Sequence, residues 1–244
     1  MKLCSFEMDE QQRLDLMEWA VLGVPHRKLK PVATGRLRVI SKQDGGKRLI
    51  FDGREGNKLL RNIEKFGLSS MEYAIDMIGN FKYGLVGDQV NWFYQLPTGE
   101  WASAMTVMVV NGVRSLMKVL SMGTGFAPLC GQTSMSILVL YKEEGEDSLG
   151  APEVFTVIPC NFLLRRAGQV VGIVIIHIDN VFVWTDDEQL RDFWEKRFQR
   201  NAKLLRSQWK YLKKVELHDN ITILGVEKGP EGVRPPPRTL TVER

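Results

Sequence analysis

Two apolar segments of this sequence each lead into a single aspartate. The first reads Tyr83-Gly-Leu-Val-Gly-Asp88, and the second reads Gly172-Ile-Val-Ile-Ile-His-Ile-Asp179. Both are predicted to be strands, and each aspartate stands where its strand turns. Carboxylates brought to one point by neighbouring strands hold divalent cations roughly 4 Å apart, the arrangement that drives in-line nucleotidyl or phosphoryl displacement. We therefore expect Asp88 and Asp179 to be metal ligands.

The bulk composition narrows the class of protein. The chain has 244 residues, 44% hydrophobic and 25% charged, enough for one domain or two closely packed subdomains. The longest apolar stretch, 170–178, is far shorter than the ~20 residues of a membrane helix, and the acidic start lacks a secretory signal. We expect an intracellular protein, nuclear or cytoplasmic, that is neither secreted nor bound to a membrane.

Cysteine and histidine do not suggest a metal site of their own. The three cysteines and three histidines are far apart in the sequence and have no paired spacing. Neither a disulfide framework nor a zinc site is therefore predicted. Any metal should be held by oxygen.

The positive charge is concentrated in one segment. The chain has a net charge of +4, but residues 189–214 contain nine Lys or Arg against two acids and carry +7, so the remainder carries 4 − 7 = −3. Such a stripe fits contact with a polyanion, and it also fits a solvated helix face.

The elements that would position the two aspartates follow from periodicity and turn residues. Besides the strand at 83–88, we expect strands at 37–40 and 48–51, 101–110 and 113–119, 154–158, the two arms of 172–184, and 221–226. The three hairpin turns are expected at Asp44-Gly45-Gly46, Asn111-Gly112 and Asp179-Asn180.

Four helices are expected from apolar spacing and capping residues. They are 9–22, a short one ending at Ile78 with Ser69 as its cap, 129–141, and 187–209 capped by Thr185-Asp186. Residues 52–57 are expected to be a loop, and 229–237 to be extended. The pattern predicts an α+β fold, a mixed or antiparallel sheet with helices packed on one side.

Six blocks, in this order, resemble the successive motifs of retroelement reverse transcriptases, closest to the gypsy class and the tyrosine-recombinase class of DIRS and VIPER types. The blocks are Lys42-Gln-Asp-Gly-Gly-Lys-Arg48 with Asp52-Gly-Arg54 and Asn57; Asp88 through Phe93-Tyr-Gln-Leu-Pro97; Leu120-Ser-Met-Gly123 with Ala127-Pro128; His177-Ile-Asp-Asn180; Leu212-Lys-Lys214 with Leu224-Gly225; and Glu231-Gly232. The resemblance covers residues 35–238.

The resemblance implies the fingers and palm of a right-hand polymerase fold. Fingers are expected at 35–84 and 98–119, and palm at 85–97 and 120–234. A helical extension is expected at 1–34 and an extended tail at 235–244, with thumb and RNase H absent. The implied activity is RNA-directed DNA polymerisation, a nucleotidyl transfer with Mg²⁺ or Mn²⁺ that uses deoxynucleoside triphosphates and a primer on an RNA or DNA template.

The resemblance also assigns roles to single residues near the metal. Asp88 and Asp179 would share the metal, and the backbone carbonyl of Gln89 would add an oxygen. Phe93 would exclude a ribose 2′-hydroxyl, or it is a core phenylalanine. Gln95 would contact the nucleotide.

Further roles concern phosphate, template and primer. Lys42 and Arg48 would clamp the triphosphate, Gly123 would let the backbone approach the nucleotide, and Lys214, or its neighbour Lys213, would act on pyrophosphate. Template and primer contacts are implied for Arg54, Asn57 and His177.

Three positions depart from the family pattern. Asn180 stands where a second adjacent aspartate is usual, His177 replaces a tyrosine, and Trp92 replaces a small residue before the aromatic gate. An amide lacks the carboxylate charge, and an indole either blocks the sugar pocket or rotates into the core. Two interpretations therefore stay open: an active polymerase domain, and a degenerate or domesticated palm that serves as an RNA or protein scaffold. An RNA-dependent RNA polymerase is a third interpretation, which Phe93 disfavours.

Overall fold

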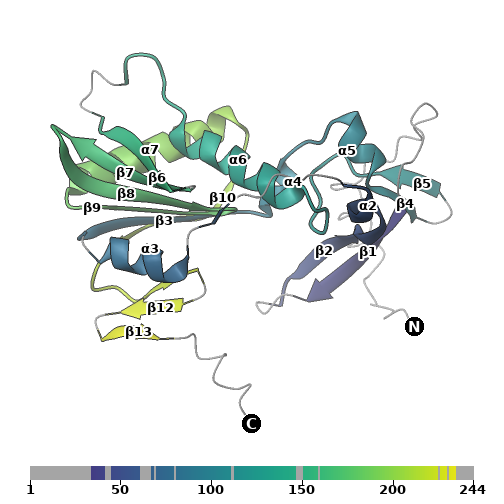
Figure 1. Ribbon diagram of the computed structural model, residues 1–244, viewed down its shortest axis with the longest axis horizontal. Coiled ribbons are helices and arrows are strands. Elements are labelled where there is room, and N and C mark those ends of the chain that lie inside the picture. Colours follow the sequence, from purple (N-terminus) through teal and green to yellow (C-terminus); the bar gives the residue numbers. More distant parts are fainter. Residues whose placement is uncertain are drawn as a thin grey trace, which may run out of the picture. The chain divides into compact units, whose positions relative to one another are not determined.

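The computed structural model describes residues 34–41, 45–60, 67–68, 70–79, 81–110, 113–146, 151–158, 160–224, 226–229 and 231–234. The chain forms two compact units: unit 1 comprises Met1–Glu64 and Asn91–Gly131, and unit 2 comprises Lys65–Val90 and Gln132–Arg244 (Figure 1). The helix expected over 9–22, Lys42, the turn at Asn111-Gly112 and the tail at 235–244 lie outside the described residues. The division into fingers and palm stays a prediction.

Unit 1 is built on a four-stranded sheet. The predicted first hairpin is confirmed as β1 (Thr34–Ser41) and β2 (Lys47–Asp52), antiparallel from Arg36 opposite Asp52 to Ser41 opposite Lys47. The second hairpin pairs β4 (Val107–Val110) with β5 (Val113–Leu116), and β1 joins the two by a short parallel pairing with β4. Its core is a cluster of five buried side chains: Leu49, Phe51, Tyr94, Met108 and Met117.

Short helices of unit 1 correct two expectations. The expected loop at 52–57 is helical from Arg54, because α2 (Arg54–Leu59) is supported by an ion pair between Glu55 and Lys58 at 2.8 Å. The expected strand at 101–110 begins only at β4, because its alanine-rich first part folds as α5 (Glu100–Ala104). A single turn, α4 (Trp92–Gln95), follows the Asp88 strand.

Unit 2 contains a six-stranded sheet whose neighbours are all antiparallel. The strand order is β10-β3-β9-β8-β7-β6. The strands are β3 (Tyr83–Gln89), β6 (Glu153–Ile158), β7 (Asn161–Arg166), β8 (Gln169–His177), β9 (Asn180–Thr185) and β10 (Trp209–Glu216). The pairing of β3 with β9 brings the two aspartate-bearing segments side by side.

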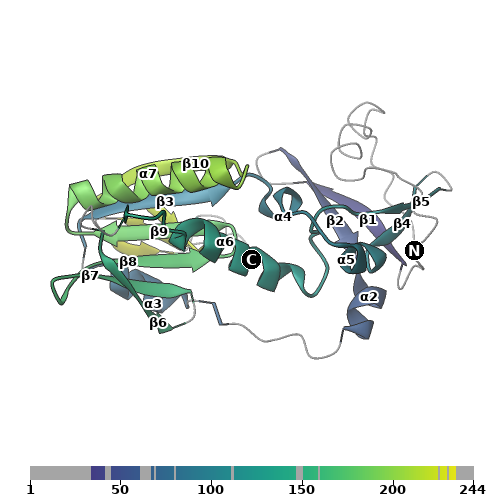
Figure 2. The ribbon, with the colours of Figure 1, turned by 90° about the horizontal axis from the view of Figure 1, so that it is seen from above.

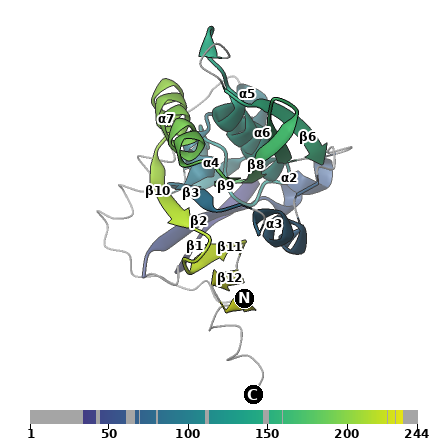
Figure 3. The ribbon, with the colours of Figure 1, turned by 90° about the vertical axis from the view of Figure 1, so that its left-hand side faces the viewer.

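Both faces of this sheet are covered by helices, so the expectation of helices on one side was wrong. α7 (Glu188–Leu204) lies on one face with the part of α6 (Ala127–Leu140) that belongs to unit 2 (Figures 2 and 3). α3 (Met71–Ile78) lies on the other (Figure 3). Consecutive residues of β8 and β9 are apolar and buried, so both faces of these two strands are apolar and each face needs a cover.

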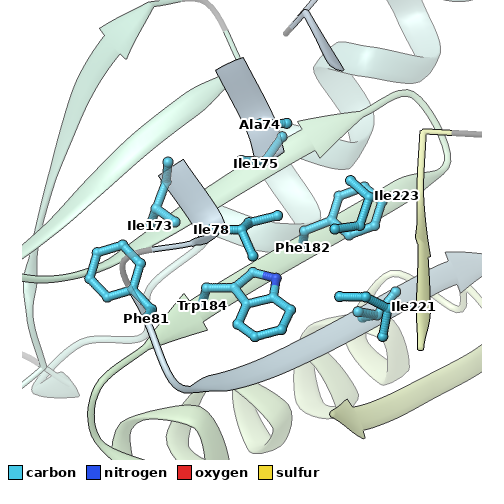
Figure 4. Close-up of a cluster of buried hydrophobic side chains, with 10 residues drawn as sticks. Ala74, Ile78, Phe81, Ile173, Ile175, Phe182, Trp184, Ile221 and Ile223 are labelled. Carbon is cyan, nitrogen blue, oxygen red and sulfur yellow. The ribbon is translucent and has the colours of Figure 1, made fainter. Parts of the chain in front are cut away.

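The core between the sheet and α3 is shown in Figure 4. Ala74 and Ile78 of α3 pack on Ile173, Ile175, Phe182 and Trp184 of the sheet, and β11 (Ile221–Ile223) adds Ile221 and Ile223. The expected strand at 221–226 is thus divided into β11 and β12 (Val226–Gly229), and β13 (Gly232–Arg234) extends this small sheet where an extended segment was expected.

Several boundaries differ from the sequence prediction. Ser70 caps α3 by accepting a hydrogen bond from the Tyr73 amide, and Asp187 caps α7 by accepting one from the Gln189 amide. α7 ends at Leu204, before the expected limit at 209, because Arg206 takes a left-handed φ of 53°. Trp209, the last residue of the expected helix, instead begins β10, a strand that was not expected. Among the described residues, none of the helices is long and apolar enough to span a membrane.

Candidate active site

A row of four polar side chains crosses the end of the unit 2 sheet. Tyr211 is opposite Asp88, Asp88 is opposite Asn180, and Asn180 is opposite His177. Directly opposed residues of antiparallel strands point to the same face, here the face that α3 covers further along the strands. The sheet register therefore gathers three of the predicted site residues and adds Tyr211, which sequence reasoning missed.

Asp179 lies in the turn beside this row. The turn that joins β8 and β9 consists of Ile178 and Asp179, one residue earlier than the predicted Asp179-Asn180. The Gln89 amide donates a hydrogen bond to the Asp179 carbonyl at 3.0 Å, so the ends of the two aspartate-bearing segments are adjacent. The Asn180 side-chain amide donates to Asp179 Oδ1 at 2.9 Å.

The turn between β8 and β9 has a strained backbone conformation, and a side chain of α6 stabilises it. Ile178 has φ 58°, a left-handed value that a β-branched residue rarely takes. Gln132, buried in α6, accepts a hydrogen bond from the Ile178 amide at 2.6 Å and donates to the Ile176 carbonyl at 3.2 Å. A glutamine inside the apolar stretch 129–141 was the available sequence signal for this support. Gln132 thus fixes where Asp179 stands.

The electrostatics connect the two carboxylates. Burial, and then the charges of Asp88 and Asp179, raise the pKa of Tyr211, so both carboxylates act on one phenol. Burial lowers the pKa of His177 against an opposing effect of Asp179. Lys210 places its ammonium 3.6 Å from Asp88 Oδ2.

These donors fit a divalent cation of the magnesium type. Carboxylate and carbonyl oxygens are the ligands that Mg²⁺ takes, and Asp88 keeps part of its side chain exposed. Within the described ranges, no group of three or more His, Cys, Asp and Glu residues is arranged around a metal position. The candidate ligand set is therefore the two aspartates, with backbone oxygens such as that of Gln89.

Lys214 does not share the face of Asp88. It is opposite Leu85, whereas Lys213 is opposite Val86, which lies on the Asp88 face two residues away. Lys214 pairs with Asp192 at 2.9 Å and Glu195 at 3.1 Å on α7, and hydrogen bonds to these carboxylates raise its pKa. The structure therefore favours Lys213 over Lys214 as the lysine nearer to Asp88.

The predicted basic stripe is only partly open to solvent. Arg191 and Arg197 are buried, and Arg197 pairs with the buried Glu146 at 2.9 Å. Lys196, Lys203 and Arg206 are exposed. The stripe is thus partly structural and partly a basic surface.

In unit 1, three predicted contact residues take part in the fold itself. Arg54 forms two hydrogen bonds of 2.7 Å with Asp52. Asn57 donates to the Gly123 carbonyl at 2.9 Å and accepts from the Gly125 amide at 2.7 Å. Gly123 has φ 106°, and a Cβ there would lie 1.9 Å from the Phe51 carbonyl oxygen. Close packing against β2 is thus one reason for this glycine.

The residues of α4 are mostly inside unit 1. Trp92 is 2% exposed and donates from Nε1 to the Gly131 carbonyl at 2.9 Å, so the indole has rotated into the core. Phe93 is also buried, with its ring edge against Gly131, and Gln95 is half-buried at the end of α4. Arg48 is exposed on β2, opposite Ile40. The roles assigned to Phe93, Gln95 and Arg48 stay predictions.

Comparison with known proteins places the fold among reverse transcriptases. The foamy viral protease-reverse transcriptase in complex with double-stranded DNA aligns over 93% of this chain and 41% of its own, at a TM-score of 0.58 and 16% identity. The dRH form with double-stranded DNA aligns over 93% of this chain and 34% of its own, at a TM-score of 0.59 and 16% identity. The complex with an RNA/DNA hybrid aligns over 93% of this chain and 26% of its own, at a TM-score of 0.57 and 16% identity.

The comparison shows the fold and no more. The chain spans less than half the length of each of these structures. No family model matches the sequence, and no curated protein matches it either. The chain has a reverse-transcriptase-like α+β fold with several antiparallel sheets.

Proposed function

We propose that this chain is a retroelement reverse transcriptase domain, of gypsy or DIRS and VIPER type, that adds deoxynucleotides to a primer on an RNA or DNA template. The observation that carries the proposal is the cross-strand row of Asp88, Asn180 and His177, with Asp179 in the adjoining turn and hydrogen-bonded through its carbonyl to Gln89. That row stands at the sheet end of a fold similar to that of reverse transcriptases.

In this proposal, Asp88 and Asp179 hold Mg²⁺ or Mn²⁺ with the Gln89 carbonyl. The bound metal would lower the pKa of the primer hydroxyl and neutralise the triphosphate. Gln132 positions Asp179 by holding the Ile178 amide. His177 supports the primer end, while Lys42 and Arg48 bind the triphosphate.

Trp92 does not argue against this activity. An indole beside the aromatic gate was expected to block the sugar pocket or to turn inward. It turns inward, and its hydrogen bond to the Gly131 carbonyl stabilises that rotamer. Phe93 follows it in the same helical turn and is proposed to exclude ribonucleotides.

Primer extension tests the proposal. With Mg²⁺ or Mn²⁺, a primer on an RNA template and deoxynucleotides, the chain should extend the primer, and Asp88→Asn should reduce the rate at least ~10³-fold. Asp186→Asn is the matched control, since Asp186 is an exposed carboxylate just beyond β9. Equal rates for the native chain and Asp88→Asn would contradict the metal assignment. Phe93→Ala should admit ribonucleotides.

A second candidate is a palm that binds nucleic acid without catalysis. It is favoured by the neutral Asn180 amide, which donates to Asp179, and by the Lys210 ammonium beside Asp88. In that case no primer is extended, yet RNA binds with a steep salt dependence. Replacing Lys196 and Lys203 together by Gln should reduce the slope of log K against log salt by about 1 to 2.

A further inference from the structure

The strand beside Asp88 carries an irregularity at Lys210. Trp209 is opposite Gln89, and Tyr211 is opposite Asp88, so Lys210 is an extra residue in β10 with no partner of its own in the register. A bulge of this kind turns a side chain away from the direction that strict alternation would give it. Here it brings the Lys210 ammonium within 3.6 Å of Asp88 Oδ2.

The two partners differ in exposure. The Lys210 side chain is 56% exposed, whereas that of Asp88 is 17% exposed. The lysine therefore reaches a mostly buried carboxylate from the solvent side. Because much of its side chain is in water, it can leave Asp88 without disturbing the core, whereas the carboxylate cannot follow it.

The charge at the site makes this contact consequential. Asp88 and Asp179 bring two negative charges, and Asn180 brings none. A lysine ammonium at Asp88 reduces the local charge to about −1, and it stands where a divalent cation would need the Asp88 oxygens. A metal that binds here gains the attraction of the carboxylates and must overcome the repulsion of the ammonium.

We propose that Lys210 is a resident counter-ion of Asp88 that a metal must displace, so that it raises the metal concentration at which the site fills. The inference rests on the proposed metal role of Asp88 and Asp179. It makes Lys210 a residue that regulates metal loading rather than a metal ligand.

Metal binding without nucleotide or nucleic acid tests this. Mn²⁺ is titrated into the full chain, and free Mn²⁺ is read by electron paramagnetic resonance. Lys210→Gln should lower the dissociation constant about tenfold, from a Coulomb effect at short range in a partly exposed site. Lys210→Arg should resemble the native chain. Lys82→Gln is the matched control: it removes the same charge from unit 2, and Lys82 is an exposed residue immediately before β3, at the end of that strand away from Asp88.

Thermal unfolding gives a second measure. The rise in Tm at a fixed, sub-saturating concentration of Mg²⁺ should be larger for Lys210→Gln than for the native chain and Lys82→Gln, because the variant without the Lys210 ammonium binds the metal more tightly. The same measurement shows whether a variant fails to fold. If Lys210→Gln fails to fold, Lys210→Arg, which keeps the charge and about the same length of side chain, still tests whether a cation at this position sets the metal affinity.

The outcomes separate this inference from the proposed function. If Mn²⁺ binds and Asp88→Asn abolishes binding, but Lys210→Gln binds Mn²⁺ no more tightly than the native chain or Lys82→Gln, the counter-ion role is wrong and the metal site stands. If neither the native chain nor any variant binds Mn²⁺, the counter-ion role and the proposed metal site are both wrong. Binding by Lys210→Gln alone supports the counter-ion role and shows a site that the lysine keeps empty.

Discussion

The two units treat their motif residues in opposite ways. In unit 1, Asn57 donates a hydrogen bond to the Gly123 carbonyl, Gly123 packs against Phe51 of β2, and Arg54 donates to Asp52. In unit 2, Asp88 and Asp179 bring two negative charges to the end of one sheet, where like charges repel.

This difference teaches how to interpret variants. A substitution in the unit 1 motifs removes contacts that the fold itself uses, so a loss of activity there does not by itself identify a nucleotide contact. A substitution at the unit 2 carboxylates removes charges that contribute little to packing. A stability measurement on each variant therefore distinguishes an effect on the fold, expected in unit 1, from an effect on activity alone, expected in unit 2.

Gly123→Ala should have the largest effect on stability. The added Cβ would lie 1.9 Å from the Phe51 carbonyl oxygen, and φ is 106°, so β2 and the loop Gly123-Thr-Gly125, here called the glycine loop, cannot both keep their positions. We expect a loss of at least about 3 kcal/mol in the free energy of unfolding. Urea denaturation followed by circular dichroism measures it.

Gly45→Ala serves as its control in the same unit. Gly45 also has a positive φ, 81°, but a Cβ there meets nothing within 4 Å. It should lose only about 1 kcal/mol, the cost of the left-handed conformation. Equal losses at the two positions would show that the contact with Phe51 is unimportant.

Asn57→Ala should come next. The side chain donates to the Gly123 carbonyl and accepts from the Gly125 amide, so its removal leaves two backbone groups of the glycine loop unsatisfied. We expect a loss of about 2 kcal/mol in unfolding free energy. Lys58→Ala, one residue away and exposed, should change stability by less than about 0.5 kcal/mol. A similar change for both variants would contradict the loop-clamping role.

The sequence predicted the parts of the fold that local patterns determine. The β1–β2 and β8–β9 hairpins, β3 and α6 have apolar periodicity between turn residues, and they form within a few residues of the predicted limits. β10 was not predicted, because the apolar spacing extended the expected helix to Trp209 and no strand was expected over 210–216. Pairing with β3, which is a long-range contact, decides its structure instead.

The candidate site was predictable in its carboxylates but not in its surroundings. Asp88 and Asp179 were visible because each ends an apolar segment. The neighbours Tyr211 and Lys210 reach the site through the register and the bulge of β10, which no local pattern gives. Gln132 acts from a different element, and Lys214 faces away because side chains alternate along β10.

Lys228→Met should stabilise unit 2. The Lys228 ammonium nitrogen is buried without a hydrogen-bond partner in the part of the chain that the structure describes, and it lies 5.8 Å from the centre of the Trp184 ring. Removing a buried unpaired charge while keeping the aliphatic volume should raise the unfolding free energy by about 1 kcal/mol. Thermal unfolding of this variant beside Lys213→Met, whose side chain is exposed, measures the gain.

The pH dependence of the Lys228 effect has a definite sign. Burial lowers the pKa of Lys228 below its ordinary 10.5, so the unfolded chain binds more protons than the folded chain between the two values. Native stability should therefore rise with pH as 10.5 is approached, and the difference from Lys228→Met should shrink there. A difference that grows with pH would contradict the burial of this ammonium.

Asp52→Asn, in unit 1, should have the smallest effect on the free energy of unfolding, and this effect should depend on pH in the acid range. Hydrogen bonds from Arg54 lower the pKa of Asp52 from 3.8 to about 2, against an opposing effect of burial. Its ion pairs with Arg38 and Arg54 thus stabilise the fold above pH 3.8 and lose this contribution as pH falls towards 2. Because both arginines are exposed, Asp52→Asn should cost less than about 1 kcal/mol at pH 7.

Denaturation of Asp52→Asn and the native chain between pH 2 and 7 measures this contribution. The two stability curves should converge as pH falls through 3.8 towards 2, because the native carboxyl then becomes neutral like the amide. Lys228→Met should leave this acid limb unchanged, since Lys228 remains charged in both states there. Curves that stay parallel down to pH 2 would mean that Arg54 is free of Asp52 in solution, and so available to a template.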